Sequence, residues 1–446
     1  MLICILLHST GIIKSKSSFI NKNKYRINSF FRILLLVTAG EGVFILPFVL
    51  ARIFRPTFLD VFQLDNLQLG TLYSTYGVVA LISYLYGGTL ADRFQPRILM
   101  GAALVMTSIG GFLMSTFPSF YSLQILYGFW GFSTTFLFWA AMIKATRNWG
   151  GEQSQGKAFG FLEGGRGIIA ATIGAIGILI FAKLIPVDIN LASFDQKKEA
   201  FRWVILFTSL MVMLVGVLSF IFMSEMENKE KSQNLIIESS FKNILKVARY
   251  PSVGLLIIIV LSAYCGYKAT DILSLYASEI MLFDEVNAAK VGSYQMYLRP
   301  VVCILIGYIA DKSTSSIWLK RGFLMLILGS MLFASGFIKA PLSVFFIFTV
   351  IITGIGTYGL RSLYFSAVKE GDIPYAFTGT AVGIISVIGY TPDIFMGPLM
   401  GVLLDNNPGL LGHQLVFLFL AGFSIVGFIA SSKFNSIVIR TKFSNQ

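Results

Sequence analysis

Cysteine and histidine are scarce in this chain of 446 residues, which holds three cysteines and two histidines. The cysteines (Cys4, Cys265 and Cys303) are too few and too scattered for a disulfide framework or a metal site. His8 and His413 share no ligand spacing with each other or with the cysteines. These absences argue against metal chemistry, and we expect neither a metal nor another cofactor.

Charged residues are scarce too. They make up 13% of the chain, whereas a soluble protein of this length carries roughly a quarter. Hydrophobic residues make up 55% and the mean hydropathy is +0.76, so much of the surface must face lipid. The net charge of +13 does not predict nucleic-acid binding, because the bases lie in short loops between apolar runs and form no basic face.

Long apolar runs dominate the sequence, and a membrane-spanning helix needs about 20 such residues. The runs are too long and too continuous for barrel strands, which alternate over about 10 residues. The sequence therefore predicts an all-α membrane protein with twelve transmembrane helices. We place these spans at roughly 29–54, 67–91, 97–116, 119–144, 157–184, 200–223, 251–277, 287–310, 318–337, 341–367, 374–403 and 412–432.

One long polar linker, residues 224–250, divides the predicted spans into six and six. The two halves are then residues 29–223 and 251–432, with tails at 1–28 and 433–446. In the first tail the apolar stretch precedes the bases, which is the reverse of a signal peptide. We therefore favour a basic tail, or an overextended start, over a cleaved signal.

The basic loops indicate how the chain lies in the membrane. Both tails, the linker, the 92–97 turn and the 144–157 loop carry bases and fall on one side. The positive-inside rule places that side in the cytoplasm. We expect an integral protein of a bacterial inner membrane with both termini cytoplasmic.

An internal repeat relates the two halves. The turn Gly88–Arg97 carries Asp92, and a weaker copy at 307–312 carries Asp311, 219 residues later. Other pairs recur at similar offsets: Gly42 with Gly266 (224), Lys144 with Lys369 (225) and Gly160 with Gly383 (223). Four pairs of segments that agree this closely indicate a duplication of six helices in parallel orientation.

The Gly88–Arg97 stretch resembles the signature loop between helices two and three of the major facilitator superfamily, Gly-x-Leu-(Ala/Ser)-Asp-Arg followed by glycine and bases. Gln95-Pro96 departs from that pattern, so we expect a stiffer turn. The resemblance implies two six-helix halves that rock around a central site. It also implies that Asp92 is a gating residue, together with Arg93, Arg97 and Asp311.

A second, looser resemblance is to a branch of bacterial permeases near the organic-anion and nitrate-type porters. It rests on the runs 149–160, 163–167 and 390–393, and on Arg361 with Tyr364, Glu370 and Pro374. The fifth span lacks the Gly-Pro element associated with drug–proton antiporters of the superfamily. The resemblance therefore favours an anionic substrate over a drug.

Ionisable residues inside the spans must point inward and pair, because each is costly in lipid. There are four acids (Glu41, Glu163, Asp271, Asp393) and four bases (Arg166, Lys268, Arg299, Arg361). The spacing of three residues puts Glu163 beside Arg166 and Lys268 beside Asp271 on one helix face. Asp393, next to Pro392, is interpreted as a gating or structural residue.

Two arginines are the main candidates for substrate binding. Arg361 has no acid within one helical turn, and Arg299 lies just before Pro300, where a kink is expected. Their planar guanidinium groups suit carboxylate or phosphate. Alternatively, they neutralise Glu41 and Asp271. The remaining binding candidates are Lys268, Arg166, Tyr297 and Tyr358, although such tyrosines also serve as packing residues.

Three acids are candidates for proton coupling. Glu41 lies between Gly40 and Gly42 with no base nearby in sequence, and a buried carboxylate without a partner is suited to carry a proton. Asp271 is the second candidate and Glu163 the third.

Together these patterns predict a secondary active transporter of a small polar solute, an organic anion or zwitterion, with proton coupling. Its partners would be that solute, the proton and the lipid bilayer, with no nucleic acid, and it would work as a monomer. No ATP-binding loop and no nucleophile–base constellation occur, so we expect no enzyme and no ATP-driven pump. The alternatives are a non-transporting membrane sensor or receptor with the same fold, and a multidrug or metabolite efflux pump.

Overall fold

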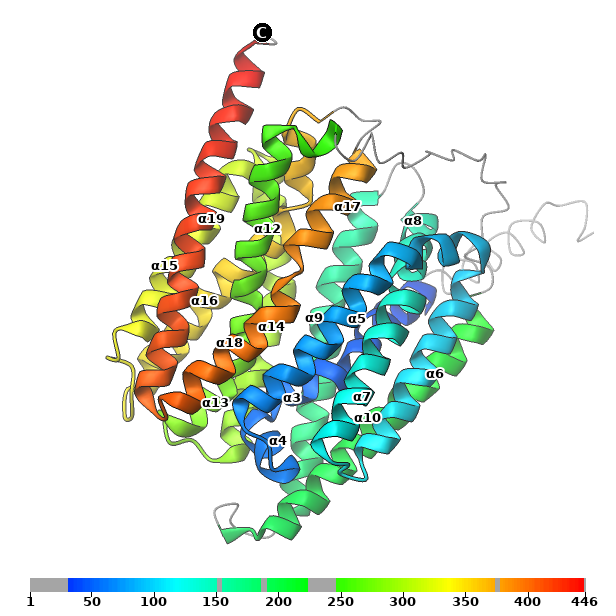
Figure 1. Ribbon diagram of the computed structural model, residues 1–446, viewed down its shortest axis with the longest axis vertical. Coiled ribbons are helices and arrows are strands. Elements are labelled where there is room, and N and C mark those ends of the chain that lie inside the picture. Colours follow the sequence, from blue (N-terminus) through cyan, green and yellow to red (C-terminus); the bar gives the residue numbers. More distant parts are fainter. Residues whose placement is uncertain (1–30, 151–154, 186–190, 224–245, 374–377, 445–446) are drawn as a thin grey trace, which may run out of the picture.

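The computed structural model describes the chain except residues 1–30, 151–154, 186–190, 224–245, 374–377 and 445–446. The described residues form helices throughout, arranged as two bundles side by side (Figure 1). Among the described residues, ten helices have the length and apolar composition to cross a membrane. The protein is therefore an all-helical integral membrane protein, as predicted. The predicted tail 1–28 and most of the predicted linker lie outside the described residues.

The N-terminal half begins with the helical segment Phe31–Ile53, which contains the π turn η1 (Ile45–Val49) and α3 (Leu50–Ile53). It continues with α4 (Arg55–Phe62), α5 (Asn66–Arg93), α6 (Pro96–Met114), α7 (Phe120–Gly131), η2 (Phe132–Trp139), α8 (Ala140–Gly150), α9 (Gln155–Leu184) and α10 (Phe194–Phe222).

The C-terminal half begins with α12 (Pro251–Ala269), the 3₁₀ turn η5 (Thr270–Ile272) and α13 (Leu273–Glu279), which together form one predicted span. It continues with α14 (Glu285–Asp311), α15 (Ser315–Ala334), α16 (Ser343–Leu363), η6 (Ser366–Glu370), α17 (Thr378–Gly389), α18 (Pro392–Asn406) and α19 (Leu410–Ser444). The last helix thus runs twelve residues past the predicted end of its span at residue 432.

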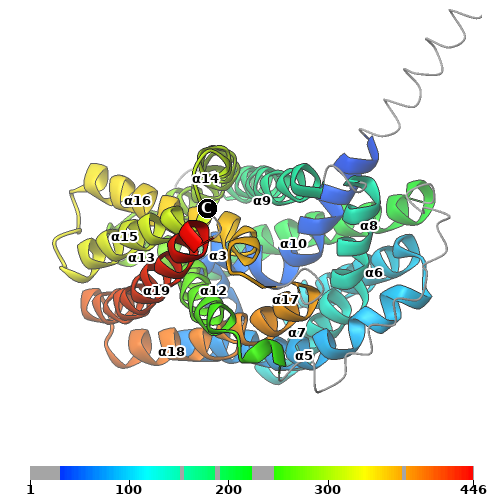
Figure 2. The same ribbon diagram turned by 90° about the horizontal axis from the view of Figure 1, so that it is seen from above.

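Two predicted spans, the second and the eighth, are absent from the ten apolar helices. Each is nevertheless a continuous helix, α5 with 28 residues and α14 with 27. At 1.5 Å per residue such a helix is about 40 Å long, which exceeds the thickness of the bilayer core. Both helices are more polar because they lie at the junction of the halves, where α5 packs on α18 and α14 packs on α9 (Figure 2).

These helix pairs repeat between the halves, as the predicted duplication requires. The second helix of each half packs on the fifth helix of the other, which gives the α5–α18 and α14–α9 pairs. Within each half the third helix packs on the sixth, which gives α6–α10 and α15–α19. The apolar residues form two buried clusters, one within each half, apart from Ala289 and Met296, which join the N-terminal cluster.

The ends of the helices follow from local sequence signals. Asp65 caps α5 and Ser193 caps α10, each in a capping box with a glutamine three residues later. Proline occupies the first turn of α6, α12 and α18, where its missing N–H costs nothing. The departure Gln95-Pro96 thus has a structural role, because Gln95 precedes α6 and Pro96 starts it.

The loops gather at two ends of the bundle, which we call upper and lower as in Figure 1. The upper end holds the turn between α5 and α6 and the end of α19. The lower end holds α4 and the turn between α13 and α14. The upper end therefore holds the 92–97 turn and the end of α19, two of the basic segments that the sequence assigns to the cytoplasm.

Side chains join the two halves at the lower end. The Thr57 hydroxyl donates to the Glu285 carboxylate (3.1 Å), which also pairs with Lys197. Asp405 accepts from the backbone N–H groups of Asn66 (3.2 Å) and Leu67 (2.7 Å), so one half caps the first turn of α5 in the other. These contacts hold the halves together at the lower end.

The cap provided by Asp405 gives a first prediction. The variant Asp405→Ala leaves the N–H groups of Asn66 and Leu67 without their acceptor, so we expect a loss of about 1–2 kcal/mol in the free energy of unfolding. Asp405→Asn retains one acceptor oxygen and should lose about half as much. Thermal unfolding of the purified protein in detergent measures both. Equal unfolding midpoints for wild type and both variants would contradict this role.

Candidate functional site

A cavity lies between the halves, near the middle of the bundle. It encloses about 650 Å³ not filled by protein atoms, including the solvent at its mouth. The first helical segment, α5, α9, α12, α16 and α18 all contribute to it. Its charged lining residues are Glu41, Arg52, Arg166, Lys268, Arg361 and Asp393, and its tyrosines are Tyr76, Tyr84, Tyr264, Tyr267 and Tyr390.

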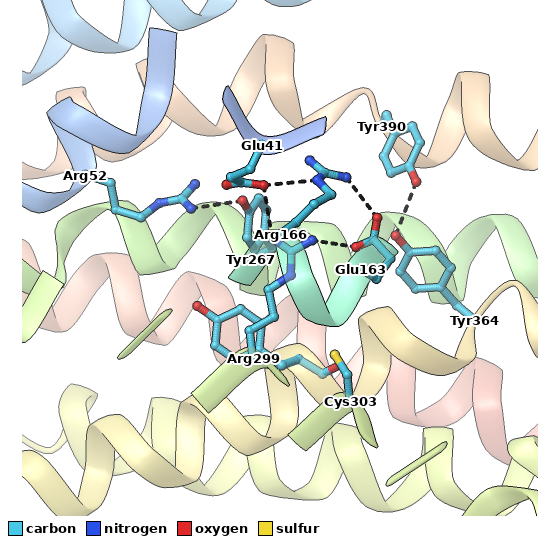
Figure 3. A network of polar contacts seen from close by, with 10 residues as sticks. Glu41, Arg52, Glu163, Arg166, Tyr267, Arg299, Cys303, Tyr364 and Tyr390 are labelled. Atoms are coloured by element: carbon cyan, nitrogen blue, oxygen red, sulfur yellow. Dashed lines mark hydrogen bonds and ion pairs between the residues drawn. The ribbon is translucent and has the colours of Figure 1, made fainter. Parts of the chain in front are cut away.

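Two acids and two bases form a closed group beside this cavity (Figure 3), which we call the Glu41 cluster. Arg166 donates to Glu41 (3.0 Å) and to Glu163 (2.8 Å). Arg299 donates to Glu163 and lies 3.6 Å from Glu41. The cluster joins the first helical segment and α9 of one half to α14 of the other. It includes the Glu163–Arg166 pair predicted from the sequence.

The expectation that Glu41 lacks a partner is wrong. Its carboxylate is held by Arg166 and Arg299, which come from helices far away in the sequence, and its side chain is only 4% exposed. Sequence distance hides such pairs, because helix packing brings them together. Arg299 is likewise paired with acids rather than free for a substrate. For Arg299 the structure therefore agrees with the alternative expectation, in which the arginine neutralises a buried acid.

A second group of two acids and two bases, the Asp271 cluster, also borders the cavity. Arg52 donates to Asp271, and its Nη1 donates to the Tyr267 hydroxyl (2.9 Å). Lys268 lies 3.5 Å from Asp271, as the spacing of three predicted, and 3.3 Å from Asp393. The cluster joins the first helical segment to α12, η5 and α18, and thus also crosses between the halves.

Arg52 is a site residue that the sequence analysis missed. It lies at the end of the first predicted span, where a base is expected to lie at the membrane interface. In the structure, however, Arg52 is buried, with 3% of its surface exposed. The π turn η1 directly precedes α3, and such turns are often found at functional sites. The signal that could have found Arg52 is Pro47, which interrupts the regular helix five residues earlier.

Arg361 differs from the other bases of the site. Its guanidinium lies over the Tyr267 ring, 3.9 Å from the centroid, and 5.6 Å from the centroid of Tyr264. Its Nε and Nη1 atoms are buried and have no hydrogen-bond partner. Among the described residues no acid forms an ion pair with Arg361, although Glu163 lies near enough to interact with it electrostatically. Buried polar groups in proteins are nearly always hydrogen-bonded, so these donors are suited to a bound acceptor.

The remaining predicted residues are distributed more widely. Tyr297 is 40% exposed and Tyr358 is buried, and neither belongs to the lining of the cavity, so their role in binding stays a prediction. The side chains of Asp92 and Asp311 lie outside the described residues. Arg93 is exposed at the end of α5, and Arg97 donates to Gln95 (2.9 Å).

Comparisons with known proteins agree with this architecture. The family described as Major Facilitator Superfamily matches residues 33–391. The inner membrane protein YqcE of Escherichia coli is 25% identical over 392 residues, covering 86% of this chain and 90% of that protein. An uncharacterised Mycoplasma pneumoniae protein, the MG294 homolog, is 23% identical over 438 residues, and the match covers 90% of each of the two chains.

Solved transporter structures share the fold. A bacterial homologue of the human lysosomal transporter Spinster, in an inward-facing and occupied conformation, superposes with a TM-score of 0.72 at 14% identity. The match covers 93% of this chain and 98% of that one. The nucleoside transporter NupG gives a TM-score of 0.65 at 15% identity, covering 92% of this chain and 99% of that one.

Proposed function

The chain belongs to the major facilitator superfamily, and we propose that it is a secondary active transporter of a small organic anion or zwitterion. Its two halves would rock about the central cavity and expose it to each side of the membrane in turn. A proton gradient would drive the net movement. We further place the protein in a bacterial inner membrane, with both termini in the cytoplasm.

The observation that carries this proposal is that Arg361 has buried N–H donors without an acceptor from the protein. A guanidinium has five N–H donors in a fixed fork, which matches the oxygens of a carboxylate or a phosphate. Two of its nitrogens are buried at the cavity without a protein acceptor. Tyr267 and Tyr264 hold the group from one side through their rings and leave its donors for a ligand.

The charge of the cavity lining supports the same substrate class. The lining and the two clusters together hold five bases (Arg52, Arg166, Lys268, Arg299, Arg361) and four acids (Glu41, Glu163, Asp271, Asp393), which leaves an excess of one positive charge. Such an excess attracts anions and repels cations in a site with little water. The lining therefore favours an organic anion over the cationic drugs of the efflux-pump alternative. The two acids of the lining, Glu41 and Asp393, are suited to bind the ammonium group of a zwitterion.

Transport by the purified protein in proteoliposomes tests the proposal. We suggest measuring uptake of gluconate, succinate, glycerol 3-phosphate and inorganic phosphate, with a neutral sugar and a cationic dye for comparison. The variant Arg361→Gln should lower the apparent affinity for the transported anion by about tenfold to hundredfold, because a hydrogen bond to a charged group contributes about 1.5–3 kcal/mol. Arg321→Gln is a matched control, because Arg321 is exposed and lies over Trp318.

Each result of this experiment has a clear reading. Uptake of an anion that Arg361→Gln weakens and Arg321→Gln leaves unchanged would support the proposal. Uptake of the neutral sugar or the cationic dye alone would contradict the assigned substrate class. Binding of an anion without any flux would instead indicate a sensor with the transporter fold.

A further inference from the structure

The four acids of the site differ in how firmly bases hold them. Glu41 and Glu163 each face both Arg166 and Arg299, and Asp271 faces both Arg52 and Lys268. Asp393 has one base, Lys268 at 3.3 Å, and shares it with Asp271. Among the described residues of the two clusters, Asp393 is therefore the carboxylate whose charge is least compensated.

Asp393 also has access to the cavity. Its side chain is 15% exposed and lines the cavity, whereas the side chains of Glu41 and Asp271 are 4% and 1% exposed. Glu163 is more exposed than Asp393, but two guanidinium groups donate to it. A proton carrier must exchange with water and must not be locked as an anion. Asp393 meets both conditions.

The surroundings of Asp393 come from several packed elements. From α12, Lys268 faces it and the Tyr264 hydroxyl donates to both carboxylate oxygens, at 3.1 Å each. Asp271 of η5 shares Lys268 with it, and Arg361 of α16 lines the same cavity. From α5, Tyr76 and Tyr84 line the cavity. The helix α19, which also packs on α18, has no titratable side chain between His413 and Lys433.

We propose that Asp393 is the residue that carries the coupling proton, and that its protonation releases Lys268 to bind the transported anion. When Asp393 is ionised, the single ammonium of Lys268 lies between two carboxylates. A proton that passes from water to an Asp393 oxygen removes one of these competitors. This inference rests on the proposed function, and it replaces both Glu41 as the proton carrier and the gating role predicted for Asp393.

The release of Lys268 couples the two ligands. Protonation of Asp393 changes the charge excess of the lining and its two clusters from one to two, so the anion binds more tightly to the protonated form. Linkage is reciprocal, so the bound anion must favour protonation of Asp393 to the same extent. The proton and the anion would then move in the same direction across the membrane.

Infrared spectroscopy of the purified protein without any substrate provides the first test. The carbonyl band of a protonated carboxyl group should appear as the pH is lowered, at pH values above those at which free carboxyl groups, with pKa values of about 4, bind protons. The variant Asp393→Asn should lack this band, and Glu41→Gln should retain it. A band that persists in Asp393→Asn, or that disappears in Glu41→Gln instead, would overturn the assignment. This outcome does not depend on which solute the protein carries.

Anion binding provides the second test, with the anion taken up most strongly in the proteoliposome screen as the probe. For wild type we expect the affinity to rise about tenfold as the pH is lowered and Asp393 binds its proton. Asp393→Asn mimics the protonated carboxyl group and should bind with high affinity at every pH. It should also lose accumulation driven by a pH gradient while it retains exchange of internal for external anion.

The two tests separate this inference from the proposed function. If the probe binds and Asp393→Asn retains the pH dependence of wild type, the role of Asp393 is wrong although the transporter assignment stands. If no anion is taken up, the proposed substrate class fails, and the infrared band alone decides whether Asp393 binds a proton.

Discussion

The variant Gly401→Ala is expected to lose about 3 kcal/mol or more in free energy of unfolding, which is a large effect for the addition of one methyl group. A Cβ atom at residue 401 would lie 2.4 Å from the Cα and 2.6 Å from the nitrogen of Leu67. These are backbone atoms of α5, so no side-chain rotation relieves the contact. The helices α5 and α18 would have to separate at the lower end, where Asp405 also joins them.

Neighbouring glycines extend this close approach along the same helix pair. A Cβ at Gly70 would lie 2.3 Å from the carbonyl oxygen of Gly397. A matched control is Gly422→Ala in α19, because a Cβ there meets no atom within 4 Å. Alanine should be neutral or stabilising by up to about 1 kcal/mol at that position. Thermal unfolding in detergent compares the two variants, and a similar midpoint for both would contradict close backbone packing as the cause.

The second large effect is expected from Arg52→Gln. This variant leaves Asp271 buried with Lys268 as its remaining base, and the loss of one partner from a buried ion pair costs about 3–5 kcal/mol. The double variant Arg52→Gln with Asp271→Asn removes both charges and should recover part of that loss. The difference between the single and double variants gives the coupling energy.

An exposed ion pair provides the control for this cycle. Arg202 and Glu199 also form a pair, but their side chains are 39% and 52% exposed. Removal of Arg202 should therefore cost about 1 kcal/mol or less. If Arg52→Gln cost no more than Arg202→Gln, or if the double variant were less stable than both single variants, the buried pair would not have the predicted effect.

Features that depend on local sequence could be predicted for both the fold and the site. Hydrophobic runs and the repeat of Asp92 and Asp311 predicted the helices and their division into two halves, because burial in lipid forces that pattern on the sequence. The pairs Glu163–Arg166 and Lys268–Asp271 were predictable as well, since three residues along a helix place two side chains on one face.

Contacts between distant helices could not be read in the same way. Glu41 appeared unpaired in sequence because its bases lie more than 100 residues away, on α9 and α14. Arg52 was missed because burial at the end of a span depends on what packs against it. Arg361 was recognised because its feature is local, namely the absence of an acid within one turn, and no other described helix supplies a partner to its Nε and Nη1.

The cap that Asp405 provides for α5 has a consequence for the transport cycle. If the lower end opens, the N–H groups of Asn66 and Leu67 lose the carboxylate of Asp405. In the same way the Thr57 hydroxyl loses the carboxylate of Glu285. Water can replace protein at each of these positions once the lower end has opened, because each broken contact then leaves a polar group at the solvent. Opening would therefore exchange one set of hydrogen bonds for another and hydrate the interface. Such an exchange keeps the closed and open forms close in free energy, so a modest ligand or proton gradient can shift the balance between them.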